Sequence, residues 1–338
     1  MKALVYTGPG HMEFLDVPDP QPRPGEVLLR VRLASICGVD LQSFRGRNSR
    51  VQPPAILGHE VVGTVVSVPD DSHGFVPGDR VAVDPLFPCG QCENCSQGRP
   101  NLCSHLGLLG TGGLPGVFAE YVCVPVGALA RCPEYVTNIG AILAEPLANA
   151  IHLLGVAQPD RDARIAIFGA GVQGILFLQI AHARGYSNIA VIDRNRQRLE
   201  IAELLGAEPA ILHPRDGVEK VLNEWTRGRG VDVAIDAAGT AVARRLCASV
   251  VRAGGRIVLL GLRQPQTLTD VRHIVRRELD VRGSFGYTPA DFAASLDAIA
   301  EGLVYLDPWF RCMSLRDGLR AFTLAERRGS LLKTLLLP

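Results

Sequence analysis

Residues 164–174 read Arg-Ile-Ala-Ile-Phe-Gly-Ala-Gly-Val-Gln-Gly, and they carry the clearest indication of how this chain folds. The apolar run 165–168 predicts a buried strand, and a helical pattern begins near residue 174, after the glycine turn. A second apolar run, 189–192, ends at Asp193. Strand, glycine turn, helix, strand and a closing acid are together typical of a dinucleotide-binding fold.

The three glycines of this turn each have a physical role in that fold. Gly169 permits the tight turn out of the strand, Gly171 lets a pyrophosphate approach the backbone, and Gly174 lets the helix pack close to the strand. The start of the helix offers free N–H groups and the positive end of its dipole to phosphates. The alternative is a glycine turn in an α/β domain without a ligand, but the complete pattern favours dinucleotide binding.

Asp193 lies where an acidic side chain accepts hydrogen bonds from the adenosine ribose. A carboxylate there repels a 2′-phosphate, so the sequence favours NAD over NADP. Arg194 and Arg198 follow closely and keep the alternative open. The predicted cofactor contacts are Gly169, Gly171, Val172, Gln173, Gly174, Asp193 and Arg198.

Composition excludes several functional classes. The chain has 338 residues, 47% of them hydrophobic and 20% charged, with a formal charge of +1. This balance predicts about two globular domains and provides no field to attract nucleic acid or a membrane surface. No apolar run reaches the roughly 20 residues needed to cross a bilayer. The N-terminal apolar region is too short for a signal peptide, so we expect a cytoplasmic protein.

Periodicity predicts two kinds of architecture along the chain. Up to about residue 130, short apolar runs separated by Pro and Gly predict a small all-β barrel or sandwich. From 164 to 284, strands and helices alternate, which predicts a doubly wound parallel sheet. A helix is predicted near 140–155, just before the glycine turn. A helix at 289–301 and a strand at 331–336 then return to the first domain. The strands predicted for the parallel sheet are 165–168, 189–192, 210–213, 231–236, 256–260 and 278–284, and the helices between them begin near 174, 195, 217, 240 and 269.

Four cysteines form the most specific local motif. Cys89, Cys92, Cys95 and Cys103 lie on one short loop, and four thiolates close a tetrahedral shell around zinc without an open position. The motif therefore predicts a structural zinc site. An iron–sulfur cluster and four free thiols are the less favoured alternatives.

Scattered motifs complete a resemblance to a known family. They are Cys37-Gly38-Val39-Asp40, Gly58-His59-Glu60, Gly78-Asp79-Arg80-Val81 and Glu145-Pro146. With the cysteine loop and the glycine turn, they make the chain resemble the zinc-dependent medium-chain dehydrogenases, the alcohol and polyol dehydrogenase family, over nearly its whole length. Glu145-Pro146 resembles the sorbitol, hexitol-phosphate, butanediol and threonine dehydrogenase branch. The resemblance implies an α/β protein, with a GroES-like β-barrel catalytic domain at 1–152 and 287–338 and a Rossmann NAD-binding domain at 153–286.

The resemblance also implies a site and a reaction. A catalytic zinc ion would be held by Cys37, His59 and Glu145, with Glu60 behind the metal and able to exchange with it. Asp40 would fix the tautomer of His59. The implied cofactors are this zinc, the structural zinc and NAD(H). The implied partners are a small alcohol or ketone and further copies of the chain in a homodimer or homotetramer.

The chain departs from the family where a proton relay normally begins. Val39 and Gln42 stand where the relay uses a hydroxyl and a histidine, so the substrate proton must leave by Glu60, Glu145 or Ser43. This departure leaves open a binding or regulatory protein with little turnover, whereas both metal motifs oppose a zinc-free quinone or enoyl reductase. The nearby arginines either clamp a substrate phosphate or carboxylate or form a solvated loop. They are Arg45, Arg47 and Arg50.

Overall fold

The computed structural model describes residues 1–327, 329 and 331–338. The chain forms two compact units, which we describe separately. The first unit comprises Met1–Glu145 and Thr288–Pro338, and the second comprises Pro146–Tyr287.

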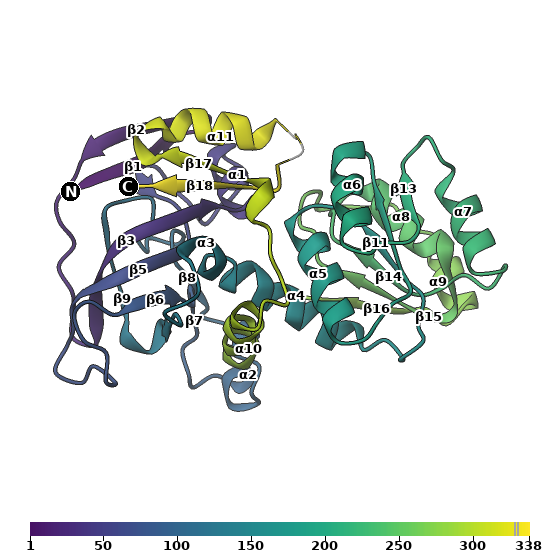
Figure 1. The fold of residues 1–338 in the computed structure, drawn as a ribbon, viewed down its shortest axis with the longest axis horizontal. Helices are drawn as coiled ribbons and strands as arrows, with labels where there is room; N and C mark the ends of the chain where they lie inside the picture. Colours follow the sequence, from purple (N-terminus) through teal and green to yellow (C-terminus); the bar gives the residue numbers. More distant parts are fainter. Residues whose placement is uncertain (328, 330) are drawn as a thin grey trace. The chain divides into compact units, whose positions relative to one another are not determined.

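The second unit is built on one parallel sheet of six strands, in the order β13-β12-β11-β14-β15-β16 (Figure 1). This order places β11 and β14 at the centre, with the chain winding outward in both directions, so the predicted doubly wound sheet is confirmed. The elements are α4 (Ala144–Ala157), β11 (Ile165–Phe168), α5 (Val172–Ala183), β12 (Ile189–Asp193), α6 (Arg196–Leu204), β13 (Ala210–Leu212), α7 (Val218–Trp225), β14 (Val231–Asp236), α8 (Ala241–Val250), β15 (Val251–Leu259), α9 (Val271–Arg276) and β16 (Asp280–Gly283).

The central strands are apolar on both faces because helices cover both faces of the sheet. All four residues of β11 are buried, and so are the first four of β12. Helix α5 is buried from Gly174 to Ala181, around its whole circumference. The helix that follows the glycine turn is therefore held firmly against the sheet, and its first turn has a fixed position at the carboxyl edge of β11.

The first unit is mainly β-structure. Its largest sheet has the order β10-β6-β5-β3-β18-β17, with β9 also paired to β3. Strand β3 buries every second residue from Val27 to Leu33, the period expected for a strand with one face on a core. The strands are β1 (Lys2–Gly8), β2 (His11–Asp16), β3 (Glu26–Ile36), β4 (Ala55–Ile56), β5 (Glu60–Ser67), β6 (Arg80–Val83), β7 (Leu86–Phe87), β8 (Gly107–Leu108), β9 (Tyr121–Pro125), β10 (Leu129–Arg131), β17 (Phe310–Ser314) and β18 (Lys333–Leu337). The helices are α1 (Gly38–Phe44), α2 (Glu93–Ser96), α3 (Asn138–Ala141), α10 (Pro289–Ala300) and α11 (Gly318–Glu326).

The C-terminal segment completes the first unit, as predicted. Figure 1 shows β18, in yellow, beside β3, in purple, and the two strands pair antiparallel with Leu335 opposite Ser35. Helix α11 was not predicted from the sequence. Its Phe322 packs against Phe44 of α1 at 5.1 Å between ring centroids and against Phe118 at 5.7 Å. The tail thus fixes α1, the helix that follows Cys37.

Two other details differ from the sequence prediction. Strand β15 begins at Val251 rather than at residue 256, and its pairing with β14 shifts register near Gly254 and Gly255. Because glycine has a low strand propensity, these two residues interrupt the apolar pattern from which the start of the strand was predicted. The helical region predicted near 140–155 is two helices, α3 and α4, with a break at residues 142–143.

A buried carboxylate ties β14 to its neighbours. Asp232 accepts hydrogen bonds from the backbone N–H of Arg164 at 2.8 Å, from Arg252 Nε at 2.7 Å and from Arg229 Nη2 at 2.8 Å. Burial alone would raise the pKa of Asp232, but the hydrogen bonds from Arg164 and Arg252 and the charge of Arg229 outweigh it, and the pKa is lowered. The ionised form is therefore the one that the fold stabilises.

Asp232→Asn is expected to lower the free energy of unfolding by about 2 kcal/mol at neutral pH, since hydrogen bonds to a charged group contribute about that much. The folded-state pKa is depressed, so the difference from the parent chain should shrink as the pH falls through that pKa. Urea unfolding at several pH values measures this. The control is Asp280→Asn, which weakens the ion pairs with Arg256 and Arg282 at a side chain that is 39% exposed, and it should cost less than about 1 kcal/mol. Equal losses in the two variants would contradict the assignment.

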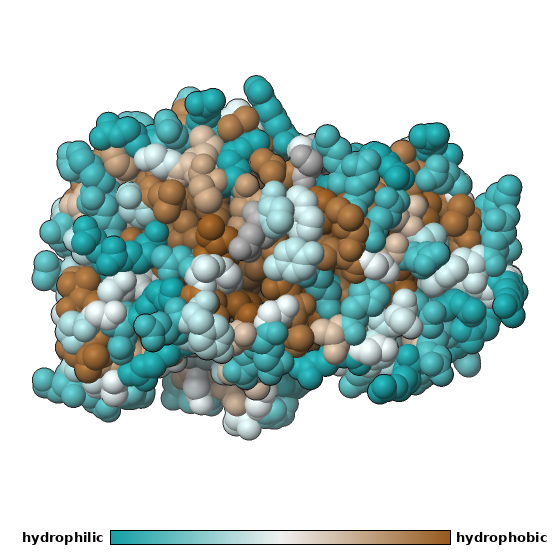
Figure 2. All heavy atoms as spheres, viewed as in Figure 1, coloured by the Kyte–Doolittle hydropathy of each residue, from teal (hydrophilic) through white to brown (hydrophobic). Residues whose placement is uncertain are grey.

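The visible surface carries polar side chains interspersed with apolar ones (Figure 2). Within the described part of the chain, no helix has both the length and the apolar character required to cross a membrane.

Candidate functional site

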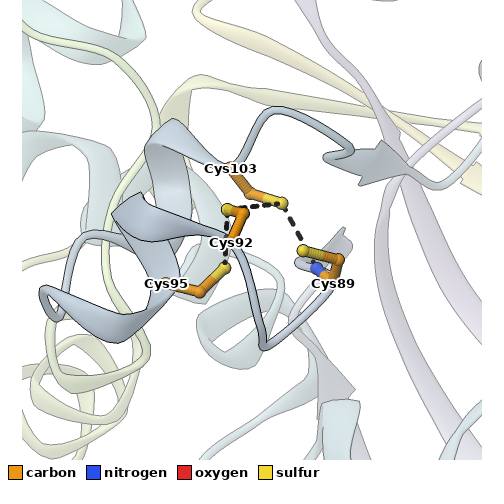
Figure 3. Close-up of side chains that lie close together, drawn as sticks. All are labelled: Cys89, Cys92, Cys95 and Cys103. Atoms are coloured by element: carbon orange, nitrogen blue, oxygen red, sulfur yellow. Dashed lines mark hydrogen bonds between the residues drawn. The ribbon is translucent and has the colours of Figure 1, made fainter.

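The four-cysteine loop brings its sulfur atoms together. Figure 3 shows the side chains of Cys89, Cys92, Cys95 and Cys103 converging on one point. The Sγ atom of Cys92 lies 3.5 Å from that of Cys95 and 3.8 Å from that of Cys103. Four sulfurs at about 2.3 Å from a tetrahedral zinc ion lie about 3.8 Å from one another. The loop is therefore shaped for zinc, with every position of the shell supplied by protein.

The loop also favours thiolate. Hydrogen bonds from the backbone N–H groups of Cys95 and Ser104 lower the pKa of Cys92 to about 5. Burial and the neighbouring Cys92 sulfur raise the pKa of Cys95 to about 12. Backbone donors already aimed at the sulfurs, such as the N–H of His105 at 3.3 Å from Cys103 Sγ, stabilise negative charge there. This environment suits a divalent cation bound by deprotonated cysteines.

A second group of possible ligands lies at the centre of the first unit. One ligand atom each from Cys37, His59 and Glu60 lies within 4.8 Å of the other two. Cys37 follows the end of β3, and Glu60 begins β5, which pairs with β3 so that Ser35 is opposite Glu60. The antiparallel pairing of these two strands is what brings the motifs around Cys37 and His59 together.

Asp40, in α1, accepts hydrogen bonds that position the ligand group of Cys37, His59 and Glu60. Its Oδ2 accepts a hydrogen bond from the Cys37 backbone N–H at 2.8 Å, and its Oδ1 accepts one from the Gly58 N–H at 3.1 Å. The same Oδ1 lies 3.6 Å from His59 Nδ1, a buried nitrogen with no hydrogen bond of its own. One carboxylate thus holds the backbone at Cys37 and at the residue before His59, and it faces the ring nitrogen of His59 at 3.6 Å without a hydrogen bond to it.

The electrostatics of this group favour a cation. Burial lowers the pKa of His59, but the negative charges of Asp40 and Cys37 outweigh it and hold the pKa well above its usual value. Burial raises the pKa of the Cys37 thiol, and the charge of Glu60 raises it further. The donor set of sulfur, nitrogen and oxygen is one that zinc accepts, and three protein ligands leave a position open.

Sequence reasoning missed two members of this site, Lys333 and Ser35. Lys333 Nζ lies 2.7 Å from Glu60 Oε1 and 2.5 Å from Glu60 Oε2, and Ser35 donates a hydrogen bond to Glu60 Oε2. The only signal in the sequence is a single lysine within the apolar run of the last strand. Glu145 lies in the first turn of α4 and is outside the group of three ligand atoms. Burial lowers the pKa of Lys333, but the charge of Glu60, with smaller contributions from other groups such as Glu145, outweighs burial and raises that pKa.

The glycine turn of the second unit fits a pyrophosphate. An added Cβ on Gly171 would meet nothing closer than Arg198 Nη1 at 3.9 Å, so the turn leaves space beside its backbone. Helix α5 begins at Val172 with Gly171 as its N-cap, and no side chain caps it. Its first N–H groups therefore remain available to an anion, with a guanidinium beside them.

Asp193 closes the glycine turn as well as ending β12. Its Oδ2 accepts a hydrogen bond from the Ala170 N–H at 2.7 Å, and its Oδ1 accepts one from the Asn195 N–H at 2.8 Å. A carboxylate has about four acceptor positions, so two bonds leave capacity for ribose hydroxyls. The side chain of Gln173 donates to the Pro146 carbonyl at 3.2 Å, which links α5 to α4.

The side chains of α1 offer no proton relay. Ser43 is buried, donates its hydroxyl proton to the Val39 carbonyl at 3.0 Å and accepts from Asn48 at 3.0 Å. The arginines that follow are also partly engaged. Arg45 pairs with Glu326 at 2.6 Å, and Arg50 donates to the Leu106 carbonyl at 2.9 Å. Within the described residues, Arg47 is the one arginine of this proposed anion clamp whose side chain makes no hydrogen bond or ion pair, although its backbone N–H donates to the Gln42 carbonyl at 2.9 Å.

Family models and known relatives match most of this chain. Residues 23–134 match the family described as "Alcohol dehydrogenase GroES-like domain", and residues 173–301 match "Zinc-binding dehydrogenase". D-xylulose reductase A of Aspergillus oryzae is 31% identical over 99% of this chain and 96% of its own, and sorbitol dehydrogenase of Bacillus subtilis is 34% identical over 90% and 87%. The structure of an alcohol dehydrogenase of E. coli CFT073, described as short-chain and solved with NADH, is 30% identical over 100% and 99% of the two chains with a TM-score of 0.92.

Proposed function

The chain belongs to the medium-chain, zinc-binding alcohol dehydrogenase family, and we propose that it transfers a hydride between NAD and a secondary alcohol carbon of a polyol. The observation that carries the proposal is the open group of Cys37, His59 and Glu60, which is separate from the closed four-cysteine site. A closed site stabilises a fold, whereas an open site is needed to bind a substrate. The relatives named for xylulose and sorbitol support a polyol.

Different side chains are proposed to bind the metal and to bind the cofactor. Cys37 and His59 would hold the catalytic metal together with one glutamate, and Asp40 would keep both in place. When bound, zinc supplies Lewis acidity, which lowers the pKa of a coordinated alcohol. Gly171, the start of α5 and Arg198 hold the pyrophosphate of NAD, and Asp193 holds its ribose. Because Val39 is apolar and the Ser43 proton is engaged, the substrate proton does not leave through α1.

A substrate panel tests the proposal directly. The zinc-loaded protein is given sorbitol, xylitol, butanediol, threonine, inositol and a hexitol phosphate, each with NAD and with NADP, and NADH formation is followed by absorbance. We expect turnover with at least one polyol and NAD. Silence across the panel from protein that carries both zinc ions would contradict polyol oxidation and favour a binding protein of the same fold.

Asp193 is proposed to set the choice of cofactor. Asp193→Asn is expected to reduce the preference for NAD over NADP by about ten- to a hundredfold, because hydrogen bonds to a charged group contribute about 1.5–3 kcal/mol. The measurement is the ratio of kcat/KM for the two cofactors. Arg194→Ala is the control of opposite sign. It removes an exposed guanidinium able to accommodate a 2′-phosphate, so it should leave the NAD preference intact or strengthen it. An unchanged ratio in Asp193→Asn would contradict the assignment.

We also propose that the protein is a homodimer or homotetramer paired through β16. This strand is at the edge of the six-stranded sheet, with its outer backbone groups unpaired in the described chain. Exposed apolar side chains lie on it and near it, among them Val281, Phe285 and Val275. Light scattering tests the oligomeric state.

A cytoplasmic location is a further proposal, since the nine cysteines are all free thiols and a reducing compartment keeps them so.

A further inference from the structure

Lys333 is a charged side chain in an unusual place. It is 5% exposed and is the first residue of β18, a strand of otherwise uncharged residues, with Glu60 beside it. Lysine is almost never fully buried unless it is paired. Here its Nζ contacts both oxygens of Glu60, at 2.7 and 2.5 Å, so the pairing is complete on the carboxylate side.

Three paired strands build this contact. Ser35 of β3 lies opposite Leu335 of β18 on one side and opposite Glu60 of β5 on the other. Ser35 and Lys333 therefore approach the same carboxylate from neighbouring strands, and Ser35 donates to Oε2. Because all three residues stand on a continuous sheet, the position of Glu60 is set by rigid structure rather than by a loop.

The ion pair between Lys333 and Glu60 lies among other charged groups that could bind a metal. Cys37, Asp40, Glu60 and Glu145 are all acidic side chains. Lys333 contacts Glu60 directly, and the charge of Glu145 also favours its protonated form. Glu60 also lies within ligand distance of Cys37 and His59. The Glu60 carboxylate can therefore interact either with the Lys333 ammonium group or with a metal held by Cys37 and His59.

We propose that Lys333 is a positioning residue that competes with the catalytic metal for Glu60, and that it thereby reserves the third protein position for Glu145. The inference rests on the proposed function, because it concerns the ligands of that same metal. With Glu60 neutralised by Lys333, the metal has Cys37, His59 and Glu145 as ligands. One position then stays open for the substrate alcohol.

Removal of the lysine charge should let Glu60 move onto the metal. Methionine keeps the approximate length of the lysine side chain but removes its charge. In Lys333→Met, Glu60 is therefore a buried carboxylate that has lost its cationic partner on β18 and lies beside a divalent metal ion. Ligation by Glu60 then fills the open position. We expect turnover to fall by about ten- to a hundredfold, as is typical when a partner of a metal ligand is lost, and zinc release to a chelator to become slower.

The spectroscopic test uses the protein with cobalt in place of the catalytic zinc. Exchange of a solvent ligand for the Glu60 carboxylate alters the visible absorption of cobalt, so Lys333→Met should show a changed spectrum and Lys333→Arg should restore that of the parent chain. Glu60→Gln combined with Lys333→Met removes the competing carboxylate and should also restore it. Lys220→Met, on the exposed face of α7, is the matched control and should change nothing.

Each outcome bears on the proposal. An unchanged cobalt spectrum and chelation rate in Lys333→Met would overturn it, as would an altered spectrum that persists in the double variant. If Lys333→Met does not fold, the double variant, which buries no unpaired charge, and Lys333→Arg still allow the comparison. The cobalt spectrum needs no substrate, so a failure of polyol turnover in the parent chain would count against the proposed function and leave this test intact.

Discussion

Replacement of His59 by alanine is expected to remove the catalytic zinc and to lower kcat/KM by about a thousandfold or more. The metal contributes several kcal/mol of charge stabilisation to such a reaction, and each 1.36 kcal/mol is a factor of ten in rate. His59 is buried and supplies the only nitrogen of the ligand group, with Asp40 behind its ring. Cys37 and a glutamate alone leave two donors, too few for the tetrahedral site.

The metal content separates this effect from a general loss of structure. We expect His59→Ala to retain the zinc of the four-cysteine loop, so that its metal content falls from about two ions per chain to about one. His73→Ala is the control, since His73 lies on an exposed loop and faces Asp71 alone. Retention of two zinc ions and of turnover in His59→Ala would show that the metal is held elsewhere. Loss of both ions with a lower melting temperature would indicate misfolding.

The sequence allowed the parallel sheet to be predicted almost strand by strand, and the reason is physical. Its strands are buried on both faces, so they appear as uninterrupted apolar runs such as 165–168 and 189–192. Strand β15 was less accurately placed because Gly254 and Gly255 interrupt its apolar pattern. Helix α11 was missed because its burial comes from Phe44 and Phe118, which are distant in the sequence.

The site was only partly accessible to the same reasoning. The four cysteines lie within 15 residues, so local spacing was enough to predict a zinc loop, whereas Cys37 and His59 are joined by strand pairing and needed a family resemblance. Lys333 lies 273 residues from Glu60 and has no motif around it. A long-range ion pair depends on sheet order, which periodicity does not determine. The structure was needed to show that Glu60 already has a partner.

Gly171 and Gly174, two of the three glycines of the cofactor turn, give the second large effect, because different physical constraints require glycine at each position. An added Cβ on Gly174 would lie 1.9 Å from the Gly169 carbonyl oxygen and 3.3 Å from Ile167 Cγ2. Backbone cannot move away as a flexible side chain can, so Gly174→Ala must push α5 off β11. Since α5 is buried around its whole circumference, we expect a loss of at least about 3 kcal/mol in the free energy of unfolding.

Gly171→Ala is the matched control for that variant, and it should behave in the opposite way. Gly171 has φ −81° and ψ −174°, which alanine adopts readily, and its added Cβ would meet only Arg198 Nη1 at 3.9 Å. Stability should change by less than about 0.5 kcal/mol, whereas NAD affinity should fall at least tenfold, because the methyl group occupies the space of the pyrophosphate. Urea unfolding and NADH fluorescence titration measure the two quantities. Unchanged NADH binding in Gly171→Ala would place the pyrophosphate elsewhere, and an unchanged unfolding midpoint in Gly174→Ala would show that the helix can yield.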